Sequence, residues 1–129
     1  MKKYIVCTSI NQPTRAIQAY DSMKDWNLIV VGDKKTPNTY SLDNGLYLSP
    51  DDQQDMSADL SELIGWNCIQ RRNFGLLYAF NLGADVVCTV DDDNIPLDNW
   101  GSSLFINQPI NMKKFKIKSI AFDPIGATS

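Results

Sequence analysis

Apolar runs alternate with amphipathic stretches along the first hundred residues of the chain. Residues 4–10 and 26–31 are apolar and rich in β-branched residues, which is typical of buried strands. The stretch between them, residues 14–24, has a helical stripe of apolar side chains. A strand, a helix and a second strand in this order predict a parallel crossover unit. We expect Pro13 at the first helical position, with Asn11 or Gln12 as the cap.

The less regular parts of the chain give weaker patterns. Residues 34–44 carry turn-forming Pro, Asn and Asp, and residues 46–50 predict a short strand closed by proline. Residues 51–64 are acidic and polar, which favours a loop with a short helix. Residues 95–100 predict an irregular turn or a short helix. In residues 114–122 apolar positions alternate with lysines, which predicts a final strand with a solvated lysine face.

A second helix, a glycine stop and a buried strand lead to the most unusual feature of the sequence. Residues 70–83 have apolar positions at helical spacing, and Gly83 suits the residue just past the helix end. The strand predicted at residues 86–90 delivers three consecutive carboxylates, Asp91 to Asp93. Adjacent like charges repel unless a cation offsets them, although an isolated acidic triplet more often forms an ordinary solvated turn.

These residues resemble a known family. Arg72-Asn73-x-Gly75, Ala79, Gly83-Ala84-Asp85, the apolar strand and the Asp triplet are together similar to the nucleotide-sugar half of glycosyltransferases with the GT-A fold, especially family 2 enzymes and reversibly glycosylated polypeptides. The resemblance implies an α/β fold: a Rossmann-like three-layer domain with a mainly parallel central sheet. It implies one domain over residues 1–129, with a donor-binding core at 1–100 and a short C-terminal extension at 101–129.

The Asp triplet suits a divalent cation. Hard cations such as Mg²⁺ and Mn²⁺ prefer carboxylate oxygens and leave positions open for phosphate. Side chains alternate along an extended backbone, so Asp91 and Asp93 are expected to point one way and Asp92 the other. By resemblance to the DxD motif, Asp93 is the direct metal ligand, and Asp91 contacts the ribose or the metal through water. Asp92 is left to bind the nucleotide or to cap the turn.

Further site residues come from strand ends and from the second helix. Ligands of open α/β sheets gather outside the carboxyl ends of the strands, where Thr8, Ser9 and Asp33 lie. By resemblance, Thr8 and Ser9 cradle the nucleoside, Asp33 accepts a hydrogen bond from uracil or ribose, and Arg72 and Asn73 contact the nucleotide. Two arginines at a helix start are unfavourable unless an anion lies nearby. We favour Arg72 over Arg71, and expect at least one of the two to be solvated.

Composition excludes several other function classes. The net charge of −3, without a broad basic stripe, argues against nucleic-acid binding. The three cysteines lie far apart in a chain without histidine, so we expect buried free thiols rather than a zinc site. No apolar stretch is long enough to be a transmembrane segment or a signal peptide, and we expect a cytoplasmic protein. A homo-oligomer is left open.

The expected function is therefore binding of a UDP-sugar through Mn²⁺ or Mg²⁺ and transfer of the sugar to an unknown acceptor. A non-catalytic nucleotide-sugar-binding or assembly module, a UDP-sugar mutase and a nucleotidyltransferase stay open as alternatives. Enzymes of the resembled family usually continue well past the DxD motif, whereas 36 residues follow Asp93 here and none is histidine. We expect a truncated, minimal or binding-only family member. The catalytic base, the sugar and the stereochemical course are not assigned.

Overall fold

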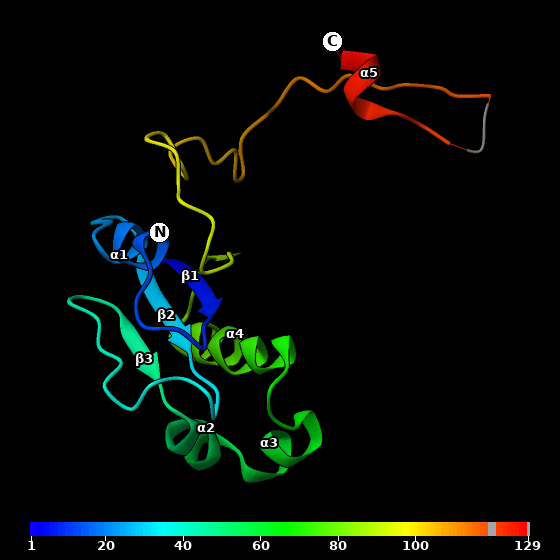
Figure 1. The fold of residues 1–129 in the computed structure, drawn as a ribbon. Coiled ribbons are helices and arrows are strands. Elements are labelled where there is room, and N and C mark those ends of the chain that lie inside the picture. The colour runs from blue at the N-terminus through cyan, green and yellow to red at the C-terminus, as the bar shows by residue number, and fades with distance from the viewer. Residues whose placement is uncertain (119–120, 129) are drawn as a thin grey trace. The chain divides into compact units, whose positions relative to one another are not determined.

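The computed structural model describes residues 1–118 and 121–128, and its centre is a parallel β-sheet. Within the described residues the sheet has four strands in the order β3 (Leu46–Leu48), β2 (Asn27–Val31), β1 (Lys3–Thr8) and β4 (Val86–Thr89). All neighbouring pairs are parallel, and helices flank the sheet (Figure 1). The α/β, Rossmann-like class expected from the sequence is thus confirmed.

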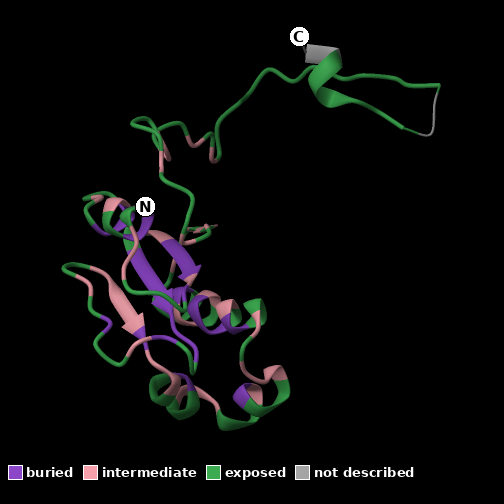
Figure 2. Ribbon diagram, viewed as in Figure 1, coloured by how far each residue is buried: buried purple, intermediate pink, exposed green. Residues whose placement is uncertain are grey.

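The core lies between the sheet and helix α4 (Arg72–Asn81). Val6, Ile29 and Val31 alternate with residues of the opposite sheet face and pack with Phe74 and Ala79 of this helix. The central strands β1 and β2 are the most fully buried part of the molecule (Figure 2). Burial on both faces accounts for their continuous apolar sequences.

Helix α1 (Arg15–Asp21) begins later than the sequence suggests. Its cap is Thr14, whose side chain accepts a hydrogen bond from the Ile17 N–H. The expectation of Pro13 at the first helical position, capped by Asn11 or Gln12, is therefore wrong. A threonine hydroxyl satisfies an unpaired N–H group of the first turn, which Pro13 cannot do.

The acidic stretch after β3 forms two helices, where the sequence predicted a loop with one short helix. Helix α2 (Pro50–Met56) has proline in its first turn, and Ser49 and Asp52 form a reciprocal capping box. Helix α3 (Ala58–Ile64) follows directly and is capped by Ser57. The acidic residues in the first turn of each helix favourably face the positive end of the helix dipole.

The second predicted helix is confirmed and carries a close backbone contact. A 3₁₀ turn, η1 (Ile69–Arg71), leads into α4, and Gly83 follows with φ +74°, as expected for a residue past a helix end. Inside the helix, a Cβ atom on Gly75 would lie 2.5 Å from Val6 Cγ1 and 2.8 Å from Val31 Cγ2. The absent side chain lets the helix approach the sheet.

The chain divides into two compact units, Met1–Asp98 and Asn99–Ser129. In the second unit the one helix among described residues is α5 (Pro124–Thr128). The strand expected at 114–122 is wrong for residues 114–118, 121 and 122, which form no strand; residues 119 and 120 lie outside the description. Phe115 and Ile117 are exposed. An alternating pattern forms a strand only where a neighbouring strand pairs with it, and no strand among the described residues pairs with residues 114–118.

No helix in the described part of the chain is both long and apolar enough to cross a bilayer.

Replacing Gly75 with alanine tests the close packing of α4. At an open helix position this change would stabilise the fold by about 0.5–1 kcal/mol. Here the methyl group meets Val6 and Val31, so we expect a loss of about 1–3 kcal/mol in the free energy of unfolding, measured by urea denaturation. Asn81→Ala, on the exposed side of the same helix, is the control. A Gly75→Ala variant more stable than the wild type would contradict this packing.

Candidate functional site

A pocket of about 390 Å³ opens at the carboxyl ends of β1 and β2. Its walls come from three segments: the end of β1 and the following loop, the end of β2, and the loop that leads into α4. Asp92 closes one end. The lining residues include the predicted Thr8, Ser9, Asp33 and Asp92, together with Ile10, Asn11, Val31, Gly32, Lys35, Asn67, Cys68, Ile69 and Arg71. Four of the predicted site residues thus meet in one pocket.

Asp92 is held by the loop that follows β1. Its Oδ2 accepts hydrogen bonds from Ser9 Oγ at 2.6 Å and from Asn11 Nδ2 at 3.1 Å. Its backbone carbonyl accepts a hydrogen bond from the Thr14 hydroxyl. These contacts place the acidic turn beside the end of β1 and give Asp92 a structural role.

Asp33 is a buried carboxylate that joins the end of β2 to the loop before α4. Its Oδ1 accepts from the Lys34 N–H at 2.6 Å, and its Oδ2 accepts from the Asn67 N–H at 2.8 Å. Asn67 has φ 57°, a left-handed conformation that asparagine tolerates better than most residues. Asp33 therefore fixes the pocket wall, and each of its carboxylate oxygens can accept a further hydrogen bond.

Arg71 is fully buried, and the sequence pattern gave it less weight than Arg72 as a functional candidate. Its Nε donates to Gln53 Oε1 at 2.8 Å, and its Nη1 donates to Ser61 Oγ at 3.1 Å and to the Gly65 carbonyl at 3.3 Å. Its guanidinium carbon lies 3.7 Å from the centre of the Trp66 ring. Burial lowers the pKa of Arg71, an effect that the negative charge of Asp33 opposes.

One guanidinium nitrogen of Arg71 has no acceptor. Nη2 is buried without a hydrogen-bond partner among the described residues. A buried unpaired donor on a charged group is costly, so the arrangement points to an acceptor that the chain itself does not supply. Since Arg71 lines the pocket, a bound ligand is the natural source of that acceptor.

Arg72 turns away from the lining of this pocket and pairs with Asp91. Its Nη2 lies 2.8 Å from Asp91 Oδ1 and 3.1 Å from the Val90 carbonyl oxygen. The Arg72 side chain is 19% exposed. The expectation that at least one of the two arginines is solvated is wrong, because Arg71 enters a polar network inside the protein and Arg72 folds back onto the acidic turn.

The remaining predicted residues lie at the surface. Asn73 and Asp93 are exposed, and Asp93 has no hydrogen bond or ion pair within the described chain. Asp91 contacts α4 and Asp92 contacts the loop after β1, and the backbone forms a turn at Asp92 and Asp93 rather than continuing the strand.

The acidic turn offers two carboxylates for a cation. Over residues 1–118 and 121–128, no group of three His, Cys, Asp or Glu side chains is placed to hold a metal ion. Asp91 and Asp93 are the exposed carboxylates of the turn, whereas Asp92 is half-buried and its Oδ2 accepts hydrogen bonds from Ser9 and Asn11. One or two carboxylates supplemented by substrate phosphates are an ordinary donor set for Mg²⁺, so these residues fit such a site.

The acidic turn also affects a neighbouring thiol. Burial, reinforced by the negative charge of Asp92, raises the pKa of Cys7 to about 12. The three cysteines are free thiols. Cys7 is buried as expected, whereas Cys68 and Cys88 are half-buried.

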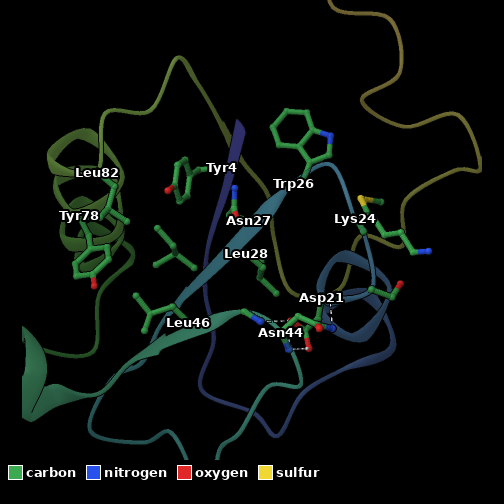
Figure 3. A pocket seen from close by; sticks show the side chains of 14 residues that line it. Tyr4, Asp21, Lys24, Trp26, Asn27, Leu28, Asn44, Leu46, Tyr78 and Leu82 are labelled. Carbon is green, nitrogen blue, oxygen red and sulfur yellow. Dashed lines mark hydrogen bonds between the residues drawn. The ribbon is translucent and has the colours of Figure 1, made fainter. Parts of the chain in front are cut away.

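A larger pocket, of about 570 Å³, lies at the opposite ends of the strands (Figure 3). Tyr78 and Leu82 of α4 line it on one side, with Leu46 of β3 across from them. Its buried carboxylate, Asp21, accepts hydrogen bonds from the backbone N–H groups of residues 43, 44 and 45. Size alone favours this pocket as the ligand site. The carboxyl-end pocket, however, contains the buried unpaired donor of Arg71 and lies where parallel sheets usually bind their ligands.

Comparison with known proteins relates the chain to glycosyltransferases. It is 25% identical over 97 residues to each of two Arabidopsis thaliana proteins, the probable glycosyltransferases STELLO2 and STELLO1. The match covers 75% of this chain but 13% of each of those proteins. No protein-family model matches the chain. A distant, glycosyltransferase-like relationship agrees with the resemblance carried by the Arg-Asn-x-Gly and Asp-triplet residues.

Alkylation of the cysteines tests the burial of Cys7 beneath the acidic turn. A thiol with a pKa of about 12 has almost no reactive thiolate at pH 8.5. We therefore expect iodoacetamide to leave Cys7 unmodified in the folded protein and to modify it in urea, as read by peptide mass spectrometry. The half-buried Cys68 provides the internal comparison. Alkylation of Cys7 at the same rate as Cys68 in the folded protein would contradict the structure.

Proposed function

We propose that this chain binds a nucleotide sugar in the carboxyl-end pocket and takes part in glycosyl transfer to an acceptor. The observation that carries the proposal is the buried Arg71 guanidinium, whose Nη2 lacks an acceptor at a pocket formed by strand ends. The similarity to probable glycosyltransferases supports the class of ligand. The pocket volume of about 390 Å³ suits a nucleoside-sized group.

The pocket suits a pyrimidine base. Val31 and Ile69 supply apolar wall, while Asp33 and Arg71 supply an acceptor and a donor. A uracil edge presents an N–H group between two carbonyl oxygens, which complements such a pair. This match favours a UDP-sugar as the sugar donor. The Asp33 carboxylate would accept a hydrogen bond from the uracil N–H, and Arg71 would donate one to a uracil carbonyl.

The diphosphate is proposed to lie toward the acidic turn. Asp91 and Asp93 would hold Mn²⁺ or Mg²⁺ there, and such a cation stabilises the charge that develops on a departing nucleoside diphosphate. Asp92, fixed by Ser9 and Asn11, keeps the turn next to the pocket. The protein's own contribution is thus to orient the base and to place two carboxylates beside the phosphates.

The other candidate functions differ in their products. A non-catalytic module would bind UDP but release none from a UDP-sugar. A mutase would yield an isomerised UDP-sugar. A nucleotidyltransferase would join UTP and a sugar 1-phosphate and release pyrophosphate. Product analysis after incubation with a panel of UDP-sugars, and separately with UTP and a sugar 1-phosphate, distinguishes these reactions from glycosyl transfer, which yields free UDP and a glycoside.

A charge placed on the pocket wall tests where the nucleotide binds. Ile69 is 55% exposed and lines the pocket, whereas Leu63 is 84% exposed and does not line it. We expect Ile69→Glu to weaken UDP binding at least about tenfold in isothermal titration, because the carboxylate repels the nucleotide. Leu63→Glu adds the same charge elsewhere and should leave the affinity unchanged. Equal affinities for the two variants would contradict this location.

Metal dependence is tested at Asp93. We expect Mn²⁺ to strengthen UDP binding to the wild type, and this gain to be lost in Asp93→Ala because one of the two available carboxylates is removed. Asp98→Ala, which removes an exposed carboxylate outside the acidic triplet, is the control. A UDP affinity that does not change with Mn²⁺, or an Mn²⁺-dependent increase in UDP affinity that persists in Asp93→Ala, would contradict the assigned metal ligands.

A further inference from the structure

Arg72 occupies an unfavourable position that needs an explanation. It is the first residue of α4, where a positive charge faces the positive end of the helix dipole. It is nevertheless held there by Asp91 Oδ1 and the Val90 carbonyl, at 2.8 and 3.1 Å. Its Nε is buried and has no acceptor among the described residues. Asp91 and the Val90 carbonyl therefore satisfy only some of the N–H donors of the Arg72 guanidinium.

Asp91 is also one of the two carboxylates available to a cation. Asp92 is less exposed, and its Oδ2 already accepts hydrogen bonds from Ser9 and Asn11. A divalent cation and a guanidinium repel each other, and Arg72 already binds one of the two carboxylate oxygens of Asp91, Oδ1. The Asp91 side chain is 59% exposed, so solvent and ions reach it.

We propose that Arg72 competes with the divalent cation for Asp91 and thereby sets the cation affinity of the site. The proposal rests on the proposed function, because it takes Asp91 and Asp93 as cation ligands. In the free protein Arg72 neutralises Asp91, so a cation without nucleotide binds weakly. A diphosphate brings further oxygen ligands for the cation and anionic acceptors for the displaced guanidinium. Cation and nucleotide therefore bind cooperatively.

A second feature of the same helix start supports a nucleotide ligand at this position. The preceding residue, Arg71, is fully buried and likewise has an N–H group without an acceptor among the described residues, at Nη2. In the proposed function the base accepts a hydrogen bond from Arg71. The phosphate oxygens are then left for the Arg72 guanidinium, to which they are well suited as acceptors.

Mn²⁺ binding without nucleotide, followed by electron paramagnetic resonance, tests the competition. Removing a partly exposed ion pair is worth up to about 1 kcal/mol, or about fivefold in affinity. We expect Arg72→Gln to bind Mn²⁺ about fivefold more tightly than the wild type. Arg15→Gln, which removes an exposed positive charge from α1, should match the wild type. When Asp91→Asn is present in both proteins, the Mn²⁺ affinity should no longer differ between the protein with Arg72 and the Arg72→Gln variant.

The outcomes separate this inference from the proposed function. Arg72→Gln that binds Mn²⁺ no more tightly than Arg15→Gln, or an absence of Mn²⁺ binding in every variant, would overturn the competition even if UDP binds. If UDP fails to bind, the Mn²⁺ measurement still decides the role of Arg72. If Arg72→Gln does not fold, the Nε–H resonance of Arg72 in the wild type should shift on Mg²⁺ addition while that of Arg15 does not. An unshifted Arg72 resonance would overturn the proposal.

Discussion

The arrangement of the site depends on one buried cation held by neutral acceptors. Arg71 donates to the side chains of Gln53 and Ser61 and to the Gly65 carbonyl, and it stacks on Trp66. Gln53 in turn donates to the carbonyls of Gly32 and Leu48, at the ends of β2 and β3. Helices α2 and α3, the turn before α4 and two strand ends are thus joined through a single guanidinium. Burying a charge with no carboxylate in direct contact is costly, and hydrogen bonds from Nε and Nη1 offset part of that cost while Nη2 has no acceptor among the described residues.

This constraint connects the fold to the proposed chemistry. The network fixes the turn that precedes α4, and Asp33 fixes the adjoining loop through the Asn67 N–H. The next residue, Arg72, is thereby directed toward Asp91 rather than toward the base pocket. One arginine faces the proposed nucleoside site and its neighbour faces the proposed phosphate and cation site. The two residues divide the recognition of one ligand between them.

Local sequence patterns predicted the parts of the structure that local physics determines. The buried strands, the helix ending before Gly83 and the meeting of strand ends follow from periodicity, capping and the geometry of parallel sheets. The stretch after β3 was expected to be a loop with one short helix because its acidic residues look solvated. It forms two helices, and Ser49 and Asp52 carry a capping signal for the first. The pattern at residues 114–118 predicted a strand, which also requires a partner strand. The role of Arg71 was underrated because its acceptors at positions 53, 61 and 65 follow no local pattern.

The most direct test of this account is the position of bound UDP, read from amide chemical shifts of the isotope-labelled protein. The account predicts changes concentrated at the carboxyl-end pocket, in residues 8–11, 31–35 and 67–71, with further changes at 91–94 when Mg²⁺ is present. Changes concentrated in residues 21–28, 44–46 and 78–82 would place the ligand in the larger opposite pocket and contradict it. A spectrum unchanged at saturating UDP would also contradict it.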